Sequence, residues 1–183
     1  TNQHYGLVKK YLNKKINVFC EKPLTTNFLK NKELFKLAKK NNCKLYVSDI
    51  ENYKNIRLDL KSINYIIRSK FSKNKADILN RLAYHDFTYI YKKIKNKKIK
   101  KTKILSKKKG EISFMIKVDD RIFYFDYNLN SKKKIHTFNK INLRTKKNPL
   151  KNMITKVINN KVNYEQNENI SIFANSIINI IFY

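Results

Sequence analysis

The feature that most constrains the fold is an apolar run that ends abruptly in a charged, proline-containing turn. Residues 16–20 predict a buried strand, and Glu21, Lys22 and Pro23 follow it directly. Proline fixes one backbone torsion and removes an amide donor, so the strand ends there. Open α/β sheets carry their chemistry at such strand ends. A lysine whose stem packs against apolar neighbours there is partly desolvated, which favours the neutral amine and suits it to proton handling.

This run lies within an alternating order of helices and strands. Residues 4–12 place apolar side chains at helical spacing, and residues 25–27 offer N-cap side chains for a second helix with a core-facing stripe. A second strand is expected over residues 44–48. The order helix, strand, helix, strand implies parallel strands joined by right-handed crossovers. We therefore predict that residues 1–50 form the second half of a Rossmann-like parallel sheet.

The hydrophobic period changes after residue 50. Ile63, Tyr65 and Ile67 alternate with polar or less buried neighbours as in a strand, and the apolar spacing over residues 78–94 is helical. Residues 92–109 are dense in lysine, which predicts a loop and an exposed edge strand.

The period becomes two over residues 111–138. Two alternating runs flank a turn at Asp119 and Asp120, and a third run at residues 134–138 would complete an antiparallel meander. Two amphipathic helices follow, one after Pro149 and one around Ile170. The predicted fold class is α/β, in which the parallel half-sheet precedes a second, α+β domain with a mainly antiparallel sheet over residues 51–183.

The formal net charge of +29 in 183 residues has two interpretations. Lysines that neutralise phosphates release counterions, so a non-enzymatic basic module that binds nucleic acid or another polyanion is one of them. Arginine, the residue best matched to phosphate and base edges, is scarce in the sequence. The aromatic run at residues 123–127 also lacks the interleaved glycines of an RNA-binding strand. We therefore interpret the charge as compositional drift that leaves solvated lysine faces, with nucleic-acid binding as the alternative.

Other features bear on the compartment and on the ends of the chain. Cys20 and Cys43 show no metal-ligand spacing, and two reduced thiols are the default for an intracellular protein, so we predict a cytoplasmic location and no metal. No apolar stretch approaches the ~20 residues of a membrane helix. The chain opens at Thr1 within a turn and stops inside the apolar run 177–183 without a cap, so we expect a fragment of a longer protein.

The N-terminal segment also carries a family resemblance. Residues 1–5, the helix after them and residues 17–24 resemble the Glu-Lys-Pro segment of the glucose-fructose oxidoreductase / inositol dehydrogenase / MocA (Gfo/Idh/MocA) family. The resemblance covers residues 1–49, the segment around His85 and the closing pattern that starts at Asn148. It implies an NAD(P)-dependent oxidoreductase with a dinucleotide-binding domain and a substrate-binding domain. The implied substrates are sugars, polyols and nucleotide sugars.

The resemblance implies roles for two basic residues. Lys22 matches the family lysine that lies by the nicotinamide and the reacting carbon, where it would polarise the reacting oxygen, and Glu21 beside it would help to order the site. His85 matches a histidine that serves as proton donor or acceptor, which fits a side chain that titrates near neutrality. The alternatives are a surface lysine and a structural histidine. We predict that Lys22 and His85 face one another across a cleft between the parallel and the antiparallel layer.

The chain departs from the family pattern four residues before this histidine. Many members carry an aspartate there, whereas this chain has Arg81. The change implies a different substrate, a negatively charged one, or a decayed site. We predict Arg81 and Asp86 as substrate-binding residues, although Asp86 lies on the following helical position from the histidine and cannot simply replace the missing acid.

The cofactor would be NAD or NADP in the intact protein. Thr1, Asn2 and His4 match a turn that borders the cofactor in the family, with ordinary helix capping by Asn2 as the alternative. The only glycines are Gly6 and Gly110, so the chain cannot supply a Gly-x-Gly-x-x-Gly cradle and should by itself be inactive. A third hypothesis is a degenerate member kept for its sheet, because the antiparallel sheets of this family often form homo-oligomer interfaces.

Overall fold

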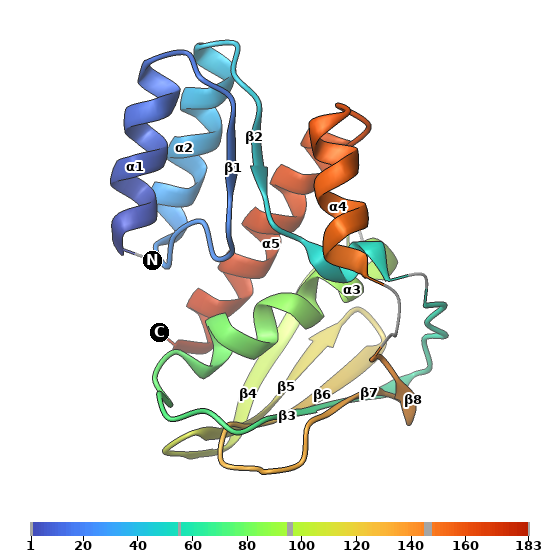
Figure 1. The fold of residues 1–183 in the computed structure, drawn as a ribbon. Helices are drawn as coiled ribbons and strands as arrows, with labels where there is room; N and C mark the ends of the chain where they lie inside the picture. Colours follow the sequence, from blue (N-terminus) through green and yellow to red (C-terminus); the bar gives the residue numbers. More distant parts are fainter. Residues whose placement is uncertain (1, 55, 95–96, 145–147, 183) are drawn as a thin grey trace.

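The computed structural model describes residues 2–54, 56–94, 97–144 and 148–182. A small parallel unit lies above a six-stranded sheet, and helices α3 and α5 lie between the two (Figure 1). The parallel unit comprises α1 (Asn2–Asn13), β1 (Val18–Cys20), α2 (Phe28–Lys40) and β2 (Leu45–Val47). The first fifty residues therefore have the predicted order, and β1 pairs with β2 in parallel.

The parallel unit forms for the reasons that its sequence gives. The side chain of Asn27 caps α2 by accepting a hydrogen bond from the amide of Lys30 at 3.0 Å. The first strand is shorter and more open than predicted, because Ile16 lies outside it and the side chain of Phe19 is exposed. Side chains alternate along a strand, so Phe19 points away from the face of buried Cys20, and its ring stacks on Tyr46.

The larger sheet has the strand order β4-β5-β6-β3-β7-β8. Its strands are β3 (Ile63–Ser69), β4 (Ile99–Lys108), β5 (Glu111–Val118), β6 (Arg121–Asn128), β7 (Ile135–Phe138) and β8 (Ile141–Asn142). The β5–β6 hairpin and the lysine-rich edge strand β4 agree with the prediction. The simple meander was wrong, because β3 is inserted between β6 and β7 and runs parallel to β6.

The two faces of β3 are also the reverse of the prediction. Ile63, Tyr65 and Ile67 point to the outer face and are exposed, whereas Ile66 and Arg68 point to the helices. Alternation separates the two faces of a strand, but it does not say which face the rest of the chain covers. The consequence for the site is that β3 directs an arginine into the space between the sheet and the helices.

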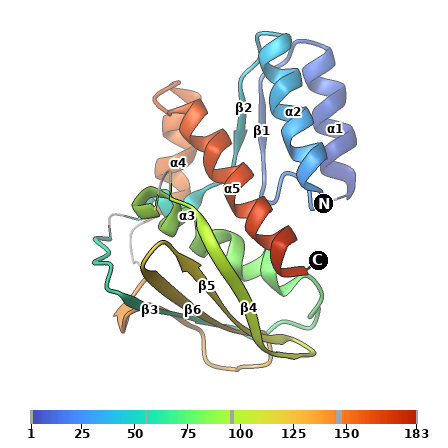
Figure 2. The ribbon, with the colours of Figure 1, turned by 180° about the vertical axis from the view of Figure 1, so that it is seen from behind.

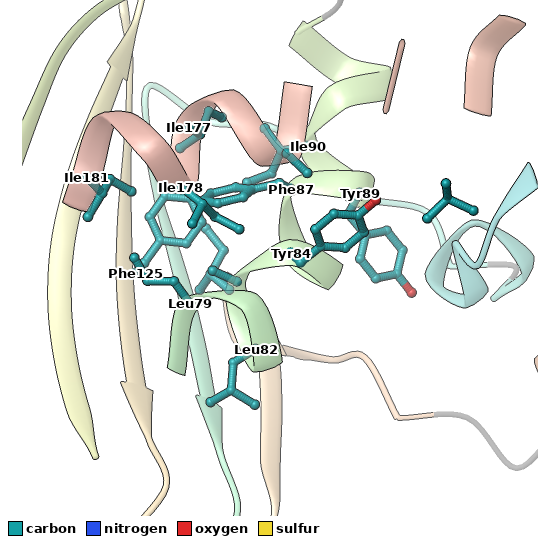
Figure 3. Packing of buried hydrophobic residues seen from close by; sticks show 14 of the residues in the cluster. Leu79, Leu82, Tyr84, Phe87, Tyr89, Ile90, Phe125, Ile177, Ile178 and Ile181 are labelled. Carbon is teal, nitrogen blue, oxygen red and sulfur yellow. The ribbon is translucent and has the colours of Figure 1, made fainter. Parts of the chain in front are cut away.

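Two helices fill that space. The π-helical turn η2 (Leu79–Ala83) leads into α3 (Tyr84–Ile94), and α5 (Tyr164–Phe182) crosses it. Figure 3 shows Phe87 of α3, Phe125 of β6 and Ile177 of α5 in one cluster, with the Phe87 and Phe125 ring centroids 5.4 Å apart. These aromatic and aliphatic side chains are buried and fix α3 on the sheet.

Helix α5 also joins the two units. It lies against α2 as well as against the sheet edge (Figure 2). The Asn167 side chain bonds both backbone polar groups of Val47 at 2.8 Å, and Asn175 donates to the carbonyl of Thr25 at 2.8 Å. Since α5 belongs to both units, the division of the chain at residue 50 stays a prediction.

The remaining helices are short. The 3₁₀ turn η1 (Ile50–Tyr53) follows β2, and α4 (Pro149–Ile158) begins at the predicted proline. Met153 is the buried member of the apolar stripe expected on α4, while Leu150, Ile154 and Ile158 are exposed. Across the part of the chain that the structure describes, every helix is too short or too polar to cross a membrane.

Candidate active site

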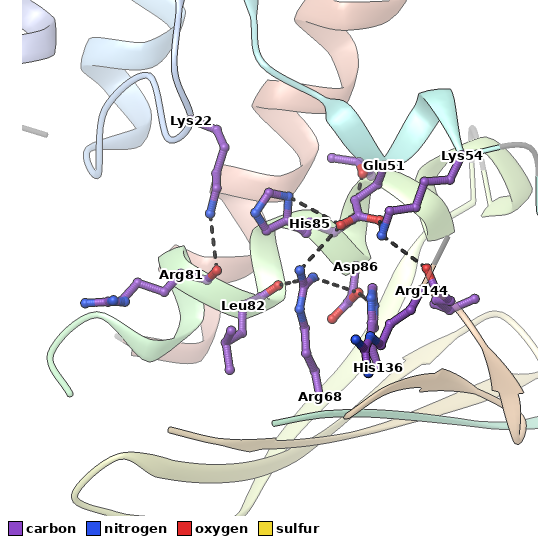
Figure 4. Close-up of polar contacts among 12 residues, drawn as sticks. Lys22, Glu51, Lys54, Arg68, Arg81, Leu82, His85, Asp86, His136 and Arg144 are labelled. Atoms are coloured by element: carbon purple, nitrogen blue, oxygen red, sulfur yellow. Dashed lines mark hydrogen bonds and ion pairs between the residues drawn. The ribbon is translucent and has the colours of Figure 1, made fainter. Parts of the chain in front are cut away.

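Lys22 lies at the carboxyl end of β1 and reaches across to the second unit. Its Nζ donates to the carbonyl oxygens of Asn80 at 3.0 Å and Arg81 at 3.2 Å, both in η2 (Figure 4). The turn is held from behind, because Nδ1 of His4 lies 3.0 Å from the carbonyl oxygen of Pro23. The Lys22–Pro23 peptide bond is cis. The strand end and the start of the α3 segment are thus tied together at this amine.

The surroundings of Lys22 favour its neutral form. Burial and, after it, the charges of Arg68 and Lys70 lower the pKa of its amine to about 7, against the smaller raising effect of Glu21 and Glu51. An amine that titrates near neutrality can hold or release a proton at a substrate oxygen.

His85 lies in the first turn of α3. Figure 4 shows its ring between the Lys22 amine and the carboxylate of Glu51. Its Nδ1 is 3.8 Å from Oε1 of Glu51. Burial brings the pKa of His85 well below its ordinary value, and the charges of Lys22 and Arg68 act in the same direction. The imidazole is therefore neutral near pH 7 and has a nitrogen able to accept a proton. The structure brings Lys22 and His85 together across the two units.

A buried ionic cluster surrounds His85. It comprises Glu51, Arg68, Asp86 and His136. The guanidinium of Arg68 lies 3.4 Å from the Glu51 carboxylate and 3.3 Å from that of Asp86. Nε2 of His136 is 2.6 Å from Oδ1 of Asp86. Both carboxylate side chains are only 2% exposed, so each depends on its cationic partners.

The structure gives Asp86 two protein partners, and its predicted substrate contact stays a prediction. Burial alone would raise the pKa of its carboxyl, but Arg68 and His136 outweigh burial and hold that pKa below the usual value. The charged carboxylate is occupied by Arg68 and His136. We therefore treat Asp86 as a positioning residue for Arg68.

Arg81 contributes its backbone to the site and turns its side chain away. Its carbonyl accepts from Lys22, whereas its guanidinium donates to Oγ of Ser72 at 2.9 Å. Figure 4 shows the side chain pointing away from His85. Burial lowers the pKa of Lys70, and the charges of Arg68, Arg81 and Lys134 add to that effect, so positive charge gathers around Lys70. A negatively charged substrate group would be attracted to this charge.

The other predicted residues lie at the margin or outside the described part. Glu21 is exposed beside Lys22, and Asn2 is the first residue of α1. Thr1 lies outside the described residues. Sequence reasoning missed Glu51 and Arg68. Glu51 follows β2 by four residues, and parallel strands end at one edge, so a polar residue there was a usable signal. Arg68 was missed because the alternation predicts Ile63, Tyr65 and Ile67 on the buried face of β3, which would put Arg68 on the outer face.

The described residues fit part of a dinucleotide site. A nicotinamide ring suits the carboxyl end of β1, where Lys22 lies. The pyrophosphate needs a glycine-rich turn after a parallel strand. Gly6 lies inside α1 instead, and Gly110 lies between the antiparallel strands β4 and β5. The residues described here therefore fit the reacting end of the cofactor and not its phosphates.

A polar cavity of about 780 Å³ opens on the far side of Glu51. Lys54, whose Nζ lies 2.6 Å from Glu51 Oε2, is part of its wall. Tyr46 of β2 and Asp49, which follows that strand, line it on one side, and Asn152 and Asn163 line it from the C-terminal segment. Amide and lysine side chains suit a ligand rich in hydroxyl or anionic groups.

Comparisons with known proteins agree with this geometry. Residues 1–49 match the family model described as oxidoreductase family, NAD-binding Rossmann fold. No curated protein matches the chain.

Three similar solved structures are dehydrogenases or a homologue of one. UDP-N-acetylglucosamine 3-dehydrogenase from Acidithiobacillus ferrooxidans has a TM-score of 0.82 and 9% identity, over 98% of this chain and 74% of that one. The WlbA dehydrogenase from Thermus thermophilus was solved with NAD and UDP-GlcNAcA. It has a TM-score of 0.78 and 9% identity, and the match covers 98% of this chain and 68% of that one. An inositol dehydrogenase homologue from Azotobacter vinelandii was solved with NADH and myo-inositol. It has a TM-score of 0.62 and 13% identity, and the match covers 73% of this chain and 43% of that one. At these identities the likeness shows the fold.

Proposed function

We propose that the chain takes part in NAD(P)-dependent hydride transfer. It has the fold of the Gfo/Idh/MocA oxidoreductases and matches their family model over residues 1–49. The substrate would be the hydroxyl or ketone form of a sugar, polyol or nucleotide sugar. The family model is that of an NAD-binding fold, so the cofactor class is NAD(P). The substrate class follows the named activities of the similar structures.

One observation carries the proposal. The amine of Lys22 and the ring of His85 come from different units, yet both lie at the same end of β1. Lys22 is held by two carbonyls of η2, and η2 leads directly into the turn that holds His85. Such a pair, an amine that titrates near neutrality and a neutral imidazole that can accept a proton, suits the interconversion of alcohol and ketone.

The proposed mechanism divides the work between these two side chains. Bound NAD(P) would supply the hydride acceptor. Lys22 would hold the substrate oxygen and polarise it, and neutral His85 would take the hydroxyl proton as the C=O bond forms. In the reverse direction His85 would return that proton. Arg68 and Asp86 contact no substrate in this scheme. Their ion pair would keep the surroundings of the His85 ring in place.

The test is hydride transfer followed by NADH and NADPH absorbance in the protein that carries this chain. Suitable probes are UDP-N-acetylglucosamine, UDP-GlcNAcA and myo-inositol. Lys22→Met and His85→Gln should each lower kcat by about 10²–10⁴-fold, the usual contribution of a positioned acid or base. Lys9→Met, which changes a lysine paired with Glu33 in the parallel unit, is the control. Unchanged turnover in both site variants would reject the proposal.

The cofactor affinity of the 183 residues alone is a separate part of the proposal. Neither glycine forms a phosphate cradle, so titration with NADH fluorescence should show weak binding at most. Tight binding would mean that another part of the chain holds the pyrophosphate.

We also propose self-association through the outer face of the six-stranded sheet. Ile63, Tyr65 and Ile67 are exposed there, and the ring of Tyr65 stacks on Tyr124 with centroids 5.3 Å apart. An apolar face of this kind is a common interface. Sedimentation of wild type and Tyr65→Lys tests it, since a monomer in both would exclude the interface.

A further inference from the structure

We propose that Glu51 is the carboxylate partner of His85 and holds its ring in the tautomer with the proton on Nδ1, so that Nε2 accepts the proton of the substrate. The proton donor is taken from the proposed function, whereas the pairing of the two side chains rests on the geometry. Glu51 lies in η1, far from α3 in sequence. It therefore supplies from another element the acid that is absent at Arg81.

The carboxylate of Glu51 faces one particular nitrogen of the neutral ring. Oε1 of Glu51 lies 3.8 Å from Nδ1 of His85, and the two side chains are 2% and 16% exposed. Among the described residues, nothing lies within hydrogen-bonding distance of this Nδ1, although the atom is buried. A buried ring nitrogen without a partner is costly, so a carboxylate facing it is the natural acceptor.

The other charged groups around the ring do not compete for this role. The carboxylate of Asp86 is taken by His136 at 2.6 Å and by Arg68. The remaining groups whose charges act on His85 belong to basic side chains. They are Lys22 from the turn after β1, Lys54 from the end of η1, Arg68 from β3 and His136 from β7. Among the charged groups that the structure places at the ring, Glu51 is the carboxylate that can accept a hydrogen bond from Nδ1–H.

The tautomer decides which nitrogen does the chemistry. A neutral imidazole has one N–H donor and one acceptor nitrogen. A carboxylate opposite Nδ1 favours the proton on Nδ1 and leaves Nε2 as the acceptor. When the substrate C–H bond breaks, the O–H electron pair would form the C=O bond and the hydroxyl proton would go to Nε2, while bound NAD(P) would supply the hydride acceptor. The imidazolium that results is stabilised by the charge of Glu51.

The 3.8 Å distance needs only a small adjustment. Catalytic hydrogen bonds are commonly longer in ligand-free enzymes and tighten when the substrate binds. Both oxygens of Glu51 already have cationic partners, because Lys54 lies 2.6 Å from its Oε2 and Arg68 lies 3.4 Å from the same Oε1 that faces His85. The pairing requires the Oε1–Nδ1 distance to shorten while these two contacts are kept.

Long-range ¹H–¹⁵N spectra of the 183-residue chain report histidine tautomers directly and need no cofactor. The chain has three histidines, and His85→Gln identifies the signal of interest. Near pH 7.5 the wild-type His85 should carry its proton on Nδ1. A proton on Nε2 would overturn the inference.

Two substitutions sharpen the test. Glu51→Gln keeps an acceptor oxygen and should keep the Nδ1 tautomer, whereas Glu51→Met removes the acceptor and should move the proton toward Nε2. Glu33→Met, in the parallel unit, should leave the His85 signal unchanged. An unchanged tautomer in Glu51→Met would also overturn the pairing. If that variant does not fold, Glu51→Met/Lys54→Met removes one of the unpaired cations and carries the same expectation.

The outcome is separable from the fate of the proposed function. An Nδ1 proton without hydride transfer would leave the Glu51–His85 pair standing and reject the dehydrogenase. Hydride transfer with an Nε2 proton would do the reverse.

Discussion

An ion pair is exposed in the parallel unit, whereas charged side chains are buried in the space beneath it. In the parallel unit, Lys9 and Glu33 lie 2.8 Å apart with side chains 43% and 45% exposed. Beneath it, Arg68 meets Glu51 and Asp86, whose side chains are 2% exposed. The matched family segment ends at residue 49, two positions before the first of these buried acids.

The difference shows which charges matter to the site. An exposed ion pair is screened by water and contributes little to stability. A buried carboxylate is expensive to desolvate and is retained only with good partners. In a chain of net charge +29, most lysines are solvated, so the buried acids mark the functional region better than the basic residues do.

The largest expected effect is the loss of a buried acid. Asp86→Ala leaves Arg68 and His136 buried without their shared carboxylate, which should lower the free energy of unfolding by about 3–5 kcal/mol. Urea unfolding at pH 7 measures it. A loss below about 1 kcal/mol would mean that the cluster is hydrated and not buried.

A smaller effect should come from the pH dependence of Lys22. Its pKa is about 7 in the folded chain and near the ordinary value of 10.5 in the unfolded chain. Between these values the unfolded chain binds more protons, so the contribution of Lys22 to stability rises with pH across this window and is lost as pH falls toward 7. From pH 7.5 to pH 9.5, wild type should gain about 2–3 kcal/mol relative to Lys22→Met. If the free energy of unfolding changed with pH by the same amount in both proteins, the amine of Lys22 would be hydrated and not buried.

The smallest effect is expected at the exposed pair. Glu33→Gln removes the partner of Lys9, yet both side chains remain open to solvent. Its urea midpoint should coincide with that of wild type, and the comparison with Asp86→Ala then sets the contrast between the two regions. A shift as large as that of Asp86→Ala would remove this contrast.

Much of the fold follows from local patterns in the sequence. The parallel order of the first fifty residues came from helical and strand periods, and Asn27 caps α2 as its position suggested. The β5–β6 hairpin followed from alternation around Asp119. The meeting of Lys22 with His85 came from the family resemblance, since nothing in either local pattern links the two segments.

The parts that could not be predicted depend on contacts between distant segments. Alternation in β3 could not show that Ile66 and Arg68 face the helices, because that choice depends on where α3 and α5 pack. The insertion of β3 beside β6 is likewise a long-range pairing. The position of Glu51 after β2 was a usable signal, but its pairing with Arg68 could not be predicted, because Arg68 lies on that misassigned face.

The most direct test of the central claim is the pKa of His85 in wild type and in Lys22→Met, measured by NMR titration. After burial, the charge of Lys22 is the largest influence that lowers the His85 pKa. Its removal should therefore raise the His85 pKa toward the ordinary value. An identical His85 pKa in the two proteins would contradict the account, because the amine and the imidazole would then not share one site.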